Sequence, residues 1–247
     1  NGRDRAGNIA SEVVVAEIEY DFTPPQLSWL SPKSGSAVNH KDVSFEKSEL
    51  LQSGSITWRW TSGVNDPDSI HIMQLFNKEL EFGVFEPATI VNAPSLVDGG
   101  IYTITFSALD PAGNESNITI VDEILYDITQ PVILLTYPLP RSISKTSAVT
   151  YNLSETLFEG EFKWIWLGGV ADPSAPYTAV LTEDERQVGD HIDVELTNNP
   201  TVVENALYTM SLSGRDRAGN KAKRAFVPGL QYDFTPPELS IISPDTG

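Results

Sequence analysis

The stretch Asp216-Arg217-Ala218-Gly219-Asn220, followed twelve residues later by Tyr232-Asp233, is one of three near-copies in this chain. The strings Asp4-Arg5-Ala6-Gly7-Asn8 and Asp110-Pro111-Ala112-Gly113-Asn114 precede it, each with its own Tyr-Asp pair at the same distance. Successive copies lie 106 residues apart, and the residues between them align at that offset without a gap. A fixed period of this size indicates a tandem array of structural units.

The period divides the chain into two complete units, 21–126 (unit 1) and 127–232 (unit 2). Residues 1–20 are interpreted as the last strands of a preceding unit, and 233–247 as the first strand of a following one. One or two strands do not bury a core by themselves. We therefore expect a longer natural chain, of which this sequence begins and ends within repeats.

Within a unit, short segments rich in β-branched and aromatic residues alternate with clusters of Gly, Pro, Asn and Asp, a pattern typical of all-β sandwiches. The strands expected in unit 1 are 26–30, 42–46, 55–61, 69–76, 82–91, 101–109 and 117–126. Seven strands in about 100 residues predict tandem seven-stranded immunoglobulin-like β-sandwiches, with strand order of the constant type.

Certain aromatic residues and glycines recur at positions where this fold uses them. A tryptophan pair two residues apart on the third strand points to one face, which favours a core position over a sugar-stacking platform. A tyrosine at the start of the sixth strand predicts a tyrosine corner, and the glycine of the Asp-x-Ala-Gly-Asn string predicts a hairpin turn with positive φ. The expected structural residues are Trp58, Trp60, Trp164, Trp166, Tyr102, Tyr208, Gly113 and Gly219.

The Asp-x-Ala-Gly-Asn string, followed about a dozen residues later by Tyr-Asp-x-Thr-x-Pro, resembles the bacterial immunoglobulin-like repeats of large surface proteins. The resemblance covers essentially the whole chain. It implies an extracellular location at a bacterial cell surface and a structural role in an adhesin stalk, filament, sheath or surface layer. The alternatives left open are an array of glycan-binding modules and the spacer of a secreted hydrolase.

Composition limits the partners. The formal charge of −18 disfavours nucleic acids and anionic lipid surfaces, whereas divalent cations remain compatible with it. There is no cysteine, and no apolar run approaches the roughly 20 residues that cross a bilayer, so no membrane insertion is expected in this segment. The expected partners are neighbouring repeats of the same chain and, through lateral self-assembly, further copies in a filament or coat.

The sequence predicts no enzymatic activity. A site built into each repeat would recur, but His40, His71 and His191 have no histidine at the equivalent position of the other unit. No phosphate-binding loop or nucleophile motif occurs. No catalytic residue and no required cofactor are therefore expected.

Acidic residues do recur. The sandwich topology places the start of the first strand, the loop after the second and the loop after the sixth at one end of each unit. Carboxylates on these loops would suit Ca²⁺, which takes six to eight oxygen ligands. The candidate calcium ligands at the repeat junctions are Asp21, Glu49 and Asp110 in unit 1, and Asp127, Glu155 and Asp216 in unit 2. Asp66 or Asp98 could approach the junction from the preceding unit. The alternative is that the aspartates cap turns and the remaining acids are solvated.

Overall fold

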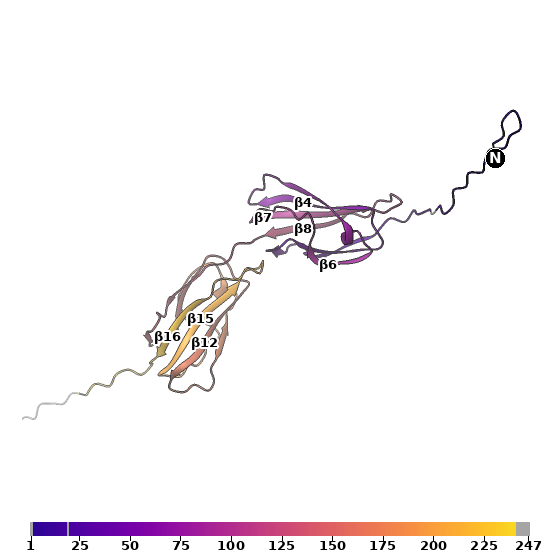
Figure 1. Ribbon diagram of the computed structural model, residues 1–247. Helices are drawn as coiled ribbons and strands as arrows, with labels where there is room; N and C mark the ends of the chain where they lie inside the picture. The colour runs from indigo at the N-terminus through magenta and orange to yellow at the C-terminus, as the bar shows by residue number, and fades with distance from the viewer. Residues whose placement is uncertain (1, 19, 241–247) are drawn as a thin grey trace, which may run out of the picture.

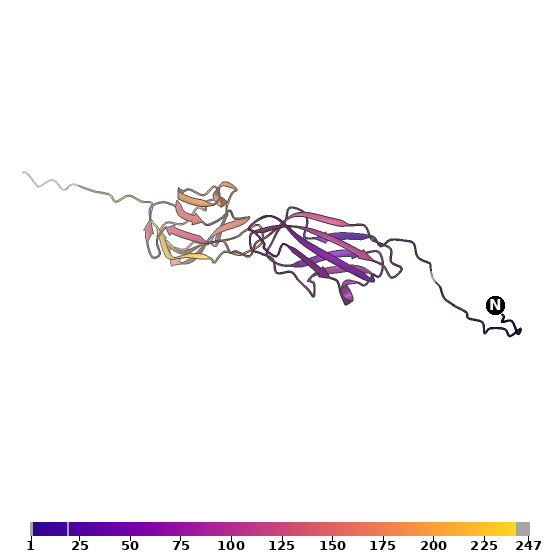
Figure 2. The same cartoon turned by 90° about the horizontal axis from the view of Figure 1, so that it is seen from above.

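The computed structural model describes residues 2–18 and 20–240. Each complete unit is a sandwich of two β-sheets, which confirms the predicted all-β, immunoglobulin-like fold class. Figures 1 and 2 show the two sandwiches arranged end to end, with the N-terminal segment extending away from unit 1. No helix among the described residues is long and apolar enough to span a membrane.

In unit 1 a three-stranded sheet in the order β1-β3-β6 faces a five-stranded sheet in the order β2-β8-β7-β4-β5. Strands β2 and β8 pair in parallel; the other pairs are antiparallel. The strands are β1 (Leu27–Ser31), β2 (Ala37–Val38), β3 (Asp42–Lys47), β4 (Ser53–Gly63), β5 (Ile70–Gln74), β6 (Gly83–Thr89), β7 (Gly100–Leu109) and β8 (Thr119–Tyr126), and the 3-10 helix η1 (Asn77–Glu79) follows β5.

Unit 2 repeats this topology, with β14-β11-β9 facing β10-β16-β15-β12-β13. Its strands are β9 (Ile133–Tyr137), β10 (Ile143–Ser144), β11 (Val149–Leu153), β12 (Glu159–Gly169), β13 (Tyr177–Val180), β14 (Gly189–Val194), β15 (Ala206–Arg215) and β16 (Ala225–Tyr232), and the 3-10 helix η2 (Asp184–Arg186) follows β13.

The constant-type strand order predicted from the sequence is wrong for the fourth strand. In that order the fourth strand joins the sheet of the first, second and fifth strands. Here β5 pairs with β4 along Ser55–Arg59, so it lies in the sheet of the third, sixth and seventh strands. The short connection after β4 favours this result because it returns the chain directly as an antiparallel hairpin. A short strand, β2, is also added where the first strand crosses to the second sheet.

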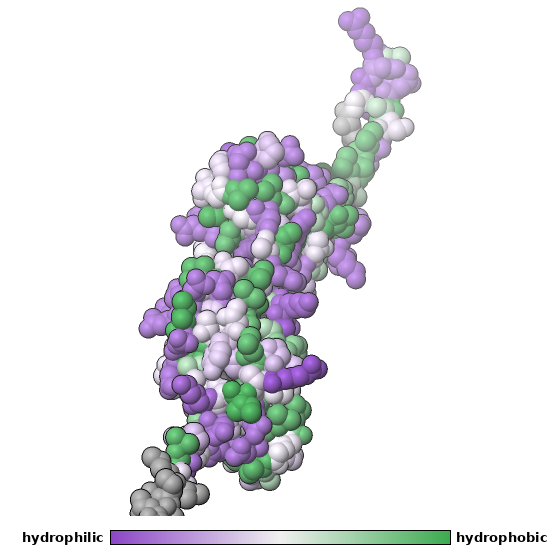
Figure 3. All heavy atoms as spheres, turned by 90° about the vertical axis from the view of Figure 1, so that its left-hand side faces the viewer, coloured by the Kyte–Doolittle hydropathy of each residue, from purple (hydrophilic) through white to green (hydrophobic). Residues whose placement is uncertain are grey.

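The cores follow from period-two alternation. Every second residue of β7 is buried, from Gly100 to Ala108, and the residues between them are partly exposed. The same alternation in β4 and β12 buries Trp58 and Trp164 between the sheets. Figure 3 shows the consequence at the surface, where hydrophilic residues are interspersed with smaller hydrophobic areas over both units.

The flanking segments are extended. Residues 2–10 close a turn through the bridge between Arg3 and Ile9, but no strand is present in 10–18. Residues 233–240 also contain no strand, and the rest of the strand expected in 233–247 lies outside the described residues. A strand forms only where a neighbour supplies its hydrogen bonds, so the sequence pattern alone does not order these segments.

A buried aspartate ties the β4–β5 hairpin to the start of β7. The Tyr102 hydroxyl donates to Asp66 Oδ2 at 2.8 Å and accepts from the Val97 N–H at 2.8 Å. His71 Nε2 lies 2.7 Å from the same carboxylate oxygen. Burial alone would raise the pKa of Asp66, but the hydrogen bonds from His71 and Tyr102 outweigh it and the pKa is lowered. Burial raises the pKa of Tyr102 to about 12.

Tyr102→Phe is expected to destabilise unit 1 by about 1–3 kcal/mol, because it leaves a buried carboxylate oxygen and a backbone N–H without this partner. Chemical denaturation of the full chain would measure the loss. The control is Tyr20→Phe, which makes the same change at an exposed position and should leave stability unchanged. Equal stability of Tyr102→Phe and the parent chain would contradict this role.

The backbone carbonyls of Glu79 and Glu185 lie at equivalent positions in the two units, and each accepts a hydrogen bond from a different kind of side chain. In unit 2 the Tyr151 hydroxyl donates to the Glu185 carbonyl at 2.7 Å, and Leu153 lies in the same core. In unit 1 the tyrosine is replaced by Phe45, and Lys47 Nζ donates to the Glu79 carbonyl at 3.1 Å. The Lys47 side chain is buried and its Nζ lies 4.8 Å from the centroid of the Phe45 ring. Burial lowers the pKa of Lys47.

The double variant Phe45→Tyr/Lys47→Leu is expected to lose less free energy of unfolding than the two single variants lose together. The difference, which is the coupling energy, should be about 0.5–3 kcal/mol. Lys47→Leu alone leaves the Glu79 carbonyl without its donor, and the new tyrosine hydroxyl would replace that donor. A double-mutant cycle measured by denaturant unfolding tests this, and strictly additive effects would refute it.

Candidate metal centre at the repeat junction

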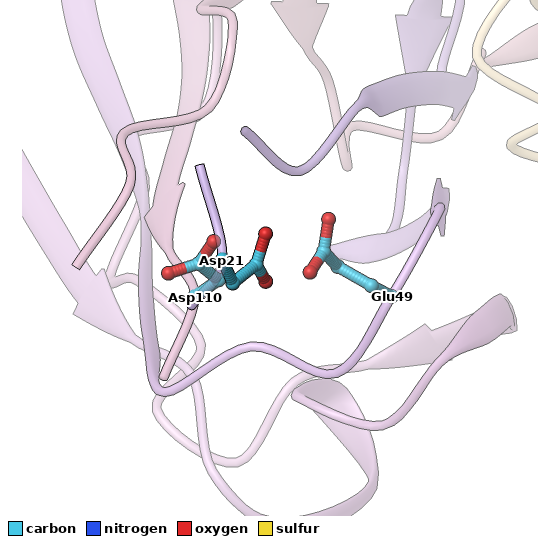
Figure 4. A group of neighbouring side chains, drawn as sticks. All are labelled: Asp21, Glu49 and Asp110. Atoms are coloured by element: carbon cyan, nitrogen blue, oxygen red, sulfur yellow. The ribbon is translucent and has the colours of Figure 1, made fainter. Parts of the chain in front are cut away.

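The structure brings together the three acidic residues expected at the upstream end of each unit. One carboxylate oxygen from each of Asp21, Glu49 and Asp110 lies within 4.8 Å of the others, and the same holds for Asp127, Glu155 and Asp216. We call these groups triad 1 and triad 2. In Figure 4 the Glu49 carboxylate points toward Asp21, with Asp110 on the far side.

Three separate segments supply each triad. Asp21 precedes β1, Glu49 follows β3, and Asp110 begins the turn between β7 and β8. Asp21 and Asp110 are held in place by hydrogen bonds from the turn between β7 and β8. Asn114 donates from its backbone N–H to Asp110 Oδ1 at 2.8 Å and from its side chain to Asp110 Oδ2 at 2.7 Å. The same side-chain amide donates to the Asp21 carbonyl at 3.1 Å, which joins the turn to the segment that leads into β1.

Triad 2 has the same arrangement. Asn220 donates to both carboxylate oxygens of Asp216, at 2.9 and 2.8 Å, and to the Asp127 carbonyl at 2.8 Å. Turn capping therefore accounts for the position of each motif aspartate, as the alternative interpretation predicted. It does not account for Glu49 and Glu155. Within the described part of the chain, neither glutamate side chain takes part in a hydrogen bond or a salt bridge.

The electrostatics of both triads are repulsive. Burial raises the pKa of Glu155, and the charges of Asp127, Asp216 and Asp98 raise it further. Burial, followed by the charges of Asp21 and Asp110, raises the pKa of Glu49 in the same direction. Mutual repulsion of carboxylates is the condition that a hard divalent cation relieves. The residues present therefore fit a Ca²⁺ ligand set chemically.

Of the two further acids considered for the junction, Asp98 reaches it and Asp66 does not. Asp98 accepts hydrogen bonds from Thr129 Oγ1 at 2.6 Å and from the Ile128 N–H at 2.7 Å, and these bonds lower its pKa. Asp66 is held by Tyr102 in the interior of unit 1. The downstream junction repeats the pattern, because Glu204 Oε1 accepts from the N–H groups of Phe234 and Thr235 at 2.8 Å.

The tryptophans expected in the cores divide into two kinds. Trp58 and Trp164 are buried, whereas Trp60 is only partly buried and Trp166 is 40% exposed. The expectation of burial is thus wrong for Trp166. Trp60 and Trp166 both lie next to a bulge in their strands, and the Nε1 of each donates to the carbonyl four residues further on, Val64 or Val170.

The expected tyrosine corner and turn glycines are present in both units. Tyr208 repeats the contacts of Tyr102, with its hydroxyl 2.5 Å from Asp172 Oδ2 and 2.9 Å from the Val203 backbone nitrogen. Gly113 and Gly219 adopt φ values of 91° and 95°, which is the left-handed backbone that their turns require.

The histidines have separate surroundings. His71 is partly buried against Asp66, His40 lies 3.8 Å from Asp42, and the ring of His191 stacks on Tyr151 with centroids 4.5 Å apart. They therefore lie in three different settings.

The sequence did not reveal the side-chain contacts between the two units. Arg217 donates to the Gly35 carbonyl and Asn39 donates to Asn220 across the junction. One difference in the sequence could have pointed to this contact: Arg217 lies where the equivalent turn of unit 1 has Pro111. A difference between copies does not reveal which side chain it faces.

Fold and site together define a pair of tandem immunoglobulin-like β-sandwich modules with an acidic group at the upstream end of each. The chain is similar to the fibronectin(III)-like modules of Clostridium thermocellum CbhA, at 13% identity over 87% of this chain and 99% of that one, with a TM-score of 0.41. It is also similar to the FN1-FN3 domains of chicken CNTN1, at 10% identity over 84% of this chain and 68% of that one, with a TM-score of 0.38. No family model and no curated protein matches the sequence.

Glu155→Gln is expected to raise the melting temperature of unit 2 at pH 7 in chelator, because it removes one repelling charge. The pKa of Glu155 is raised in the folded state, so folding binds its proton more tightly. Its contribution to stability is therefore present at low pH and is lost as the pH rises above the ordinary value of 4.5. Thermal unfolding followed as a function of pH measures this, and the variant should show a smaller decline over that range than the parent chain. Identical pH profiles would contradict the repulsion.

Millimolar Ca²⁺ is expected to raise the melting temperature of the parent chain and to have a smaller effect on Glu155→Gln. Calorimetry with and without chelator measures both shifts, and Glu183→Gln, an exposed residue outside the triad, is the control. A melting temperature of the parent chain that does not change with Ca²⁺ would contradict calcium binding at the junction.

Proposed function

We propose that this chain is a non-catalytic structural segment of a long bacterial surface protein, located outside the cell, in which successive units hold a distal part of the protein at a distance. The observation that carries the proposal is the direct, hydrogen-bonded junction between unit 1 and unit 2. Strand β8 ends at Tyr126 and β9 begins at Ile133, so very few residues separate the two sandwiches.

The connecting residues are held by unit 1. The Asp127 N–H donates to the Val38 carbonyl at 2.9 Å, and the Asp98 carboxylate accepts from Ile128 and Thr129. The connection therefore leaves unit 1 in a direction fixed by unit 1 itself. Short connections that are hydrogen-bonded along their length resist bending more than solvated Gly/Ser linkers do.

Two side-chain contacts join the bodies of the units. Asn39 Nδ2 donates to Asn220 Oδ1 at 3.1 Å, and the Arg217 guanidinium donates to the Gly35 carbonyl at 2.8 Å. Both unit 2 residues belong to the Asp-x-Ala-Gly-Asn turn. The same turn thus supplies a triad aspartate, ties down the segment before β9 and contacts the preceding unit. A chain of units joined in this way suits reach, spacing or sheathing.

The surface location and the bacterial origin rest on the resemblance of the repeat motif. A stalk, a filament or sheath subunit and a surface-layer component share the mechanics described here, as does the spacer of a secreted hydrolase. Lateral assembly into a filament or coat would add contacts between chains. Antibody labelling of intact producing cells, before and after external protease treatment, tests the location. Signal only after cell lysis would contradict it.

Pairs of spin labels, one in each unit, are expected to give a narrow distance distribution, which Arg217→Ala and Asp98→Ala should broaden by removing junction contacts. Pulsed dipolar spectroscopy of the full chain measures it. Arg59→Ala, an exposed residue on β4, is the control and should change nothing. A parent distribution as broad as that of a variant with a Gly/Ser linker inserted after Tyr126 would contradict the proposed spacer.

A further inference from the structure

Unit 2 carries an open groove at one end of its five-stranded sheet, with a volume of about 770 Å³. Its floor is the start of β12 and the end of β15, including Gly160 and Gly214. Four cationic side chains line it, namely Arg186, Arg215, Lys221 and Arg224. We call it the basic groove. It is distinct from the triads and from the junction contacts.

Two of these cations have partners within unit 2. Arg215 forms a two-pronged pair with Glu159, at 2.9 and 2.7 Å, and Arg186 donates to the carbonyls of Thr182 and Phe158. Lys221 and Arg224 are exposed, and neither side chain forms a hydrogen bond or a salt bridge with any described residue. Two acids, Glu159 and Glu161, also line the groove, so its lining holds four cationic and two acidic side chains and is positive overall.

The fold does not require this charge. The equivalent groove of unit 1 has a volume of about 400 Å³ and carries Leu109, Glu115 and Ile118 in place of Arg215, Lys221 and Arg224. Residues 215–224 contain five of the 16 basic residues of a chain whose formal charge is −18. Exposed cations of this kind contribute little to folding stability. Three of these five, Arg215, Lys221 and Arg224, line this one groove, and their gathering there points to a bound anion.

The groove also has an apolar component. The Phe158 side chain is 53% exposed, and the Arg215 guanidinium carbon lies 5.9 Å from the centroid of its ring. An aromatic face packs against the C–H groups of a sugar ring, while neighbouring lysine and arginine side chains pair with acidic substituents. A single inorganic anion would use the cations and leave the aromatic ring unused.

We propose that the basic groove of unit 2 binds a linear anionic polysaccharide, with Lys221 and Arg224 pairing with its carboxylate or sulfate groups and Phe158 contacting a sugar ring. The acidic side chains of unit 1 in another copy are a less suitable partner, because its triad is partly buried and its other acids are spread along the unit. This binding is independent of the spacer role.

The test uses the full chain in low salt with three probes: dextran sulfate, polygalacturonate and neutral dextran. Affinity electrophoresis is expected to show binding to at least one of the two polyanions and none to neutral dextran. Lys221→Glu/Arg224→Glu should weaken that binding at least about tenfold, because two charge-assisted contacts become repulsive. The control Lys33→Glu/Lys78→Glu makes the same change in net charge at exposed positions of unit 1 and should weaken it much less.

The reciprocal variant Leu109→Arg/Glu115→Lys/Ile118→Arg places the three cations in unit 1 and is expected to add a second binding site. Absence of binding to both polyanions, or equal losses in the groove and control variants, would overturn the proposal. Concentration-dependent self-association that Lys221→Glu/Arg224→Glu abolishes, without polyanion binding, would assign the groove to a second copy of the chain instead. Spin-label distances report separately on the spacer role.

Discussion

The arrangement of each unit depends on one buried carboxylate. Asp66 in unit 1 and Asp172 in unit 2 each accept a hydrogen bond from the tyrosine near the start of β7 or β15. Each also caps the turn that follows β4 or β12. A buried carboxylate must be fully hydrogen-bonded, because its desolvation is otherwise costly. This requirement fixes the hairpin, the tyrosine corner and the edge of the five-stranded sheet relative to one another.

At the opposite end of the sheet, the Asp-x-Ala-Gly-Asn turn serves both the unit and the array. Its aspartate is satisfied by the asparagine of the same turn, and that asparagine also binds a carbonyl in the segment before the first strand of its unit. The first copy, at residues 4–8, forms the same internal hydrogen bonds although it lies outside both sandwiches. The turn is therefore a local structure, and the neighbouring unit makes use of it.

The two units show that one topology carries different chemistry on its surface. The Lys47 ammonium in unit 1 and the Tyr151 hydroxyl in unit 2 donate to equivalent carbonyls, those of Glu79 and Glu185. Outside the core the constraint is weaker, and the groove of unit 2 is lined by four cationic side chains whereas no lysine or arginine lines the equivalent groove of unit 1. Side chains at interior positions must maintain packing and hydrogen bonding together, whereas side chains at solvated positions can differ between units without disturbing the fold.

The sequence by itself determined the 106-residue period, the all-β class, the positions of the longer strands in unit 1 and the meeting of three acidic residues at one end of each unit. These follow from alternation, turn chemistry and the order of strands, which are carried by neighbouring residues. Only the tertiary structure decided that β5 joins β4, that Trp166 stays partly exposed, and that Asp98 and Arg217 contact the adjoining unit. Each of these depends on which distant segment offers the better packing or hydrogen-bond partner, and that choice is not encoded in any local pattern.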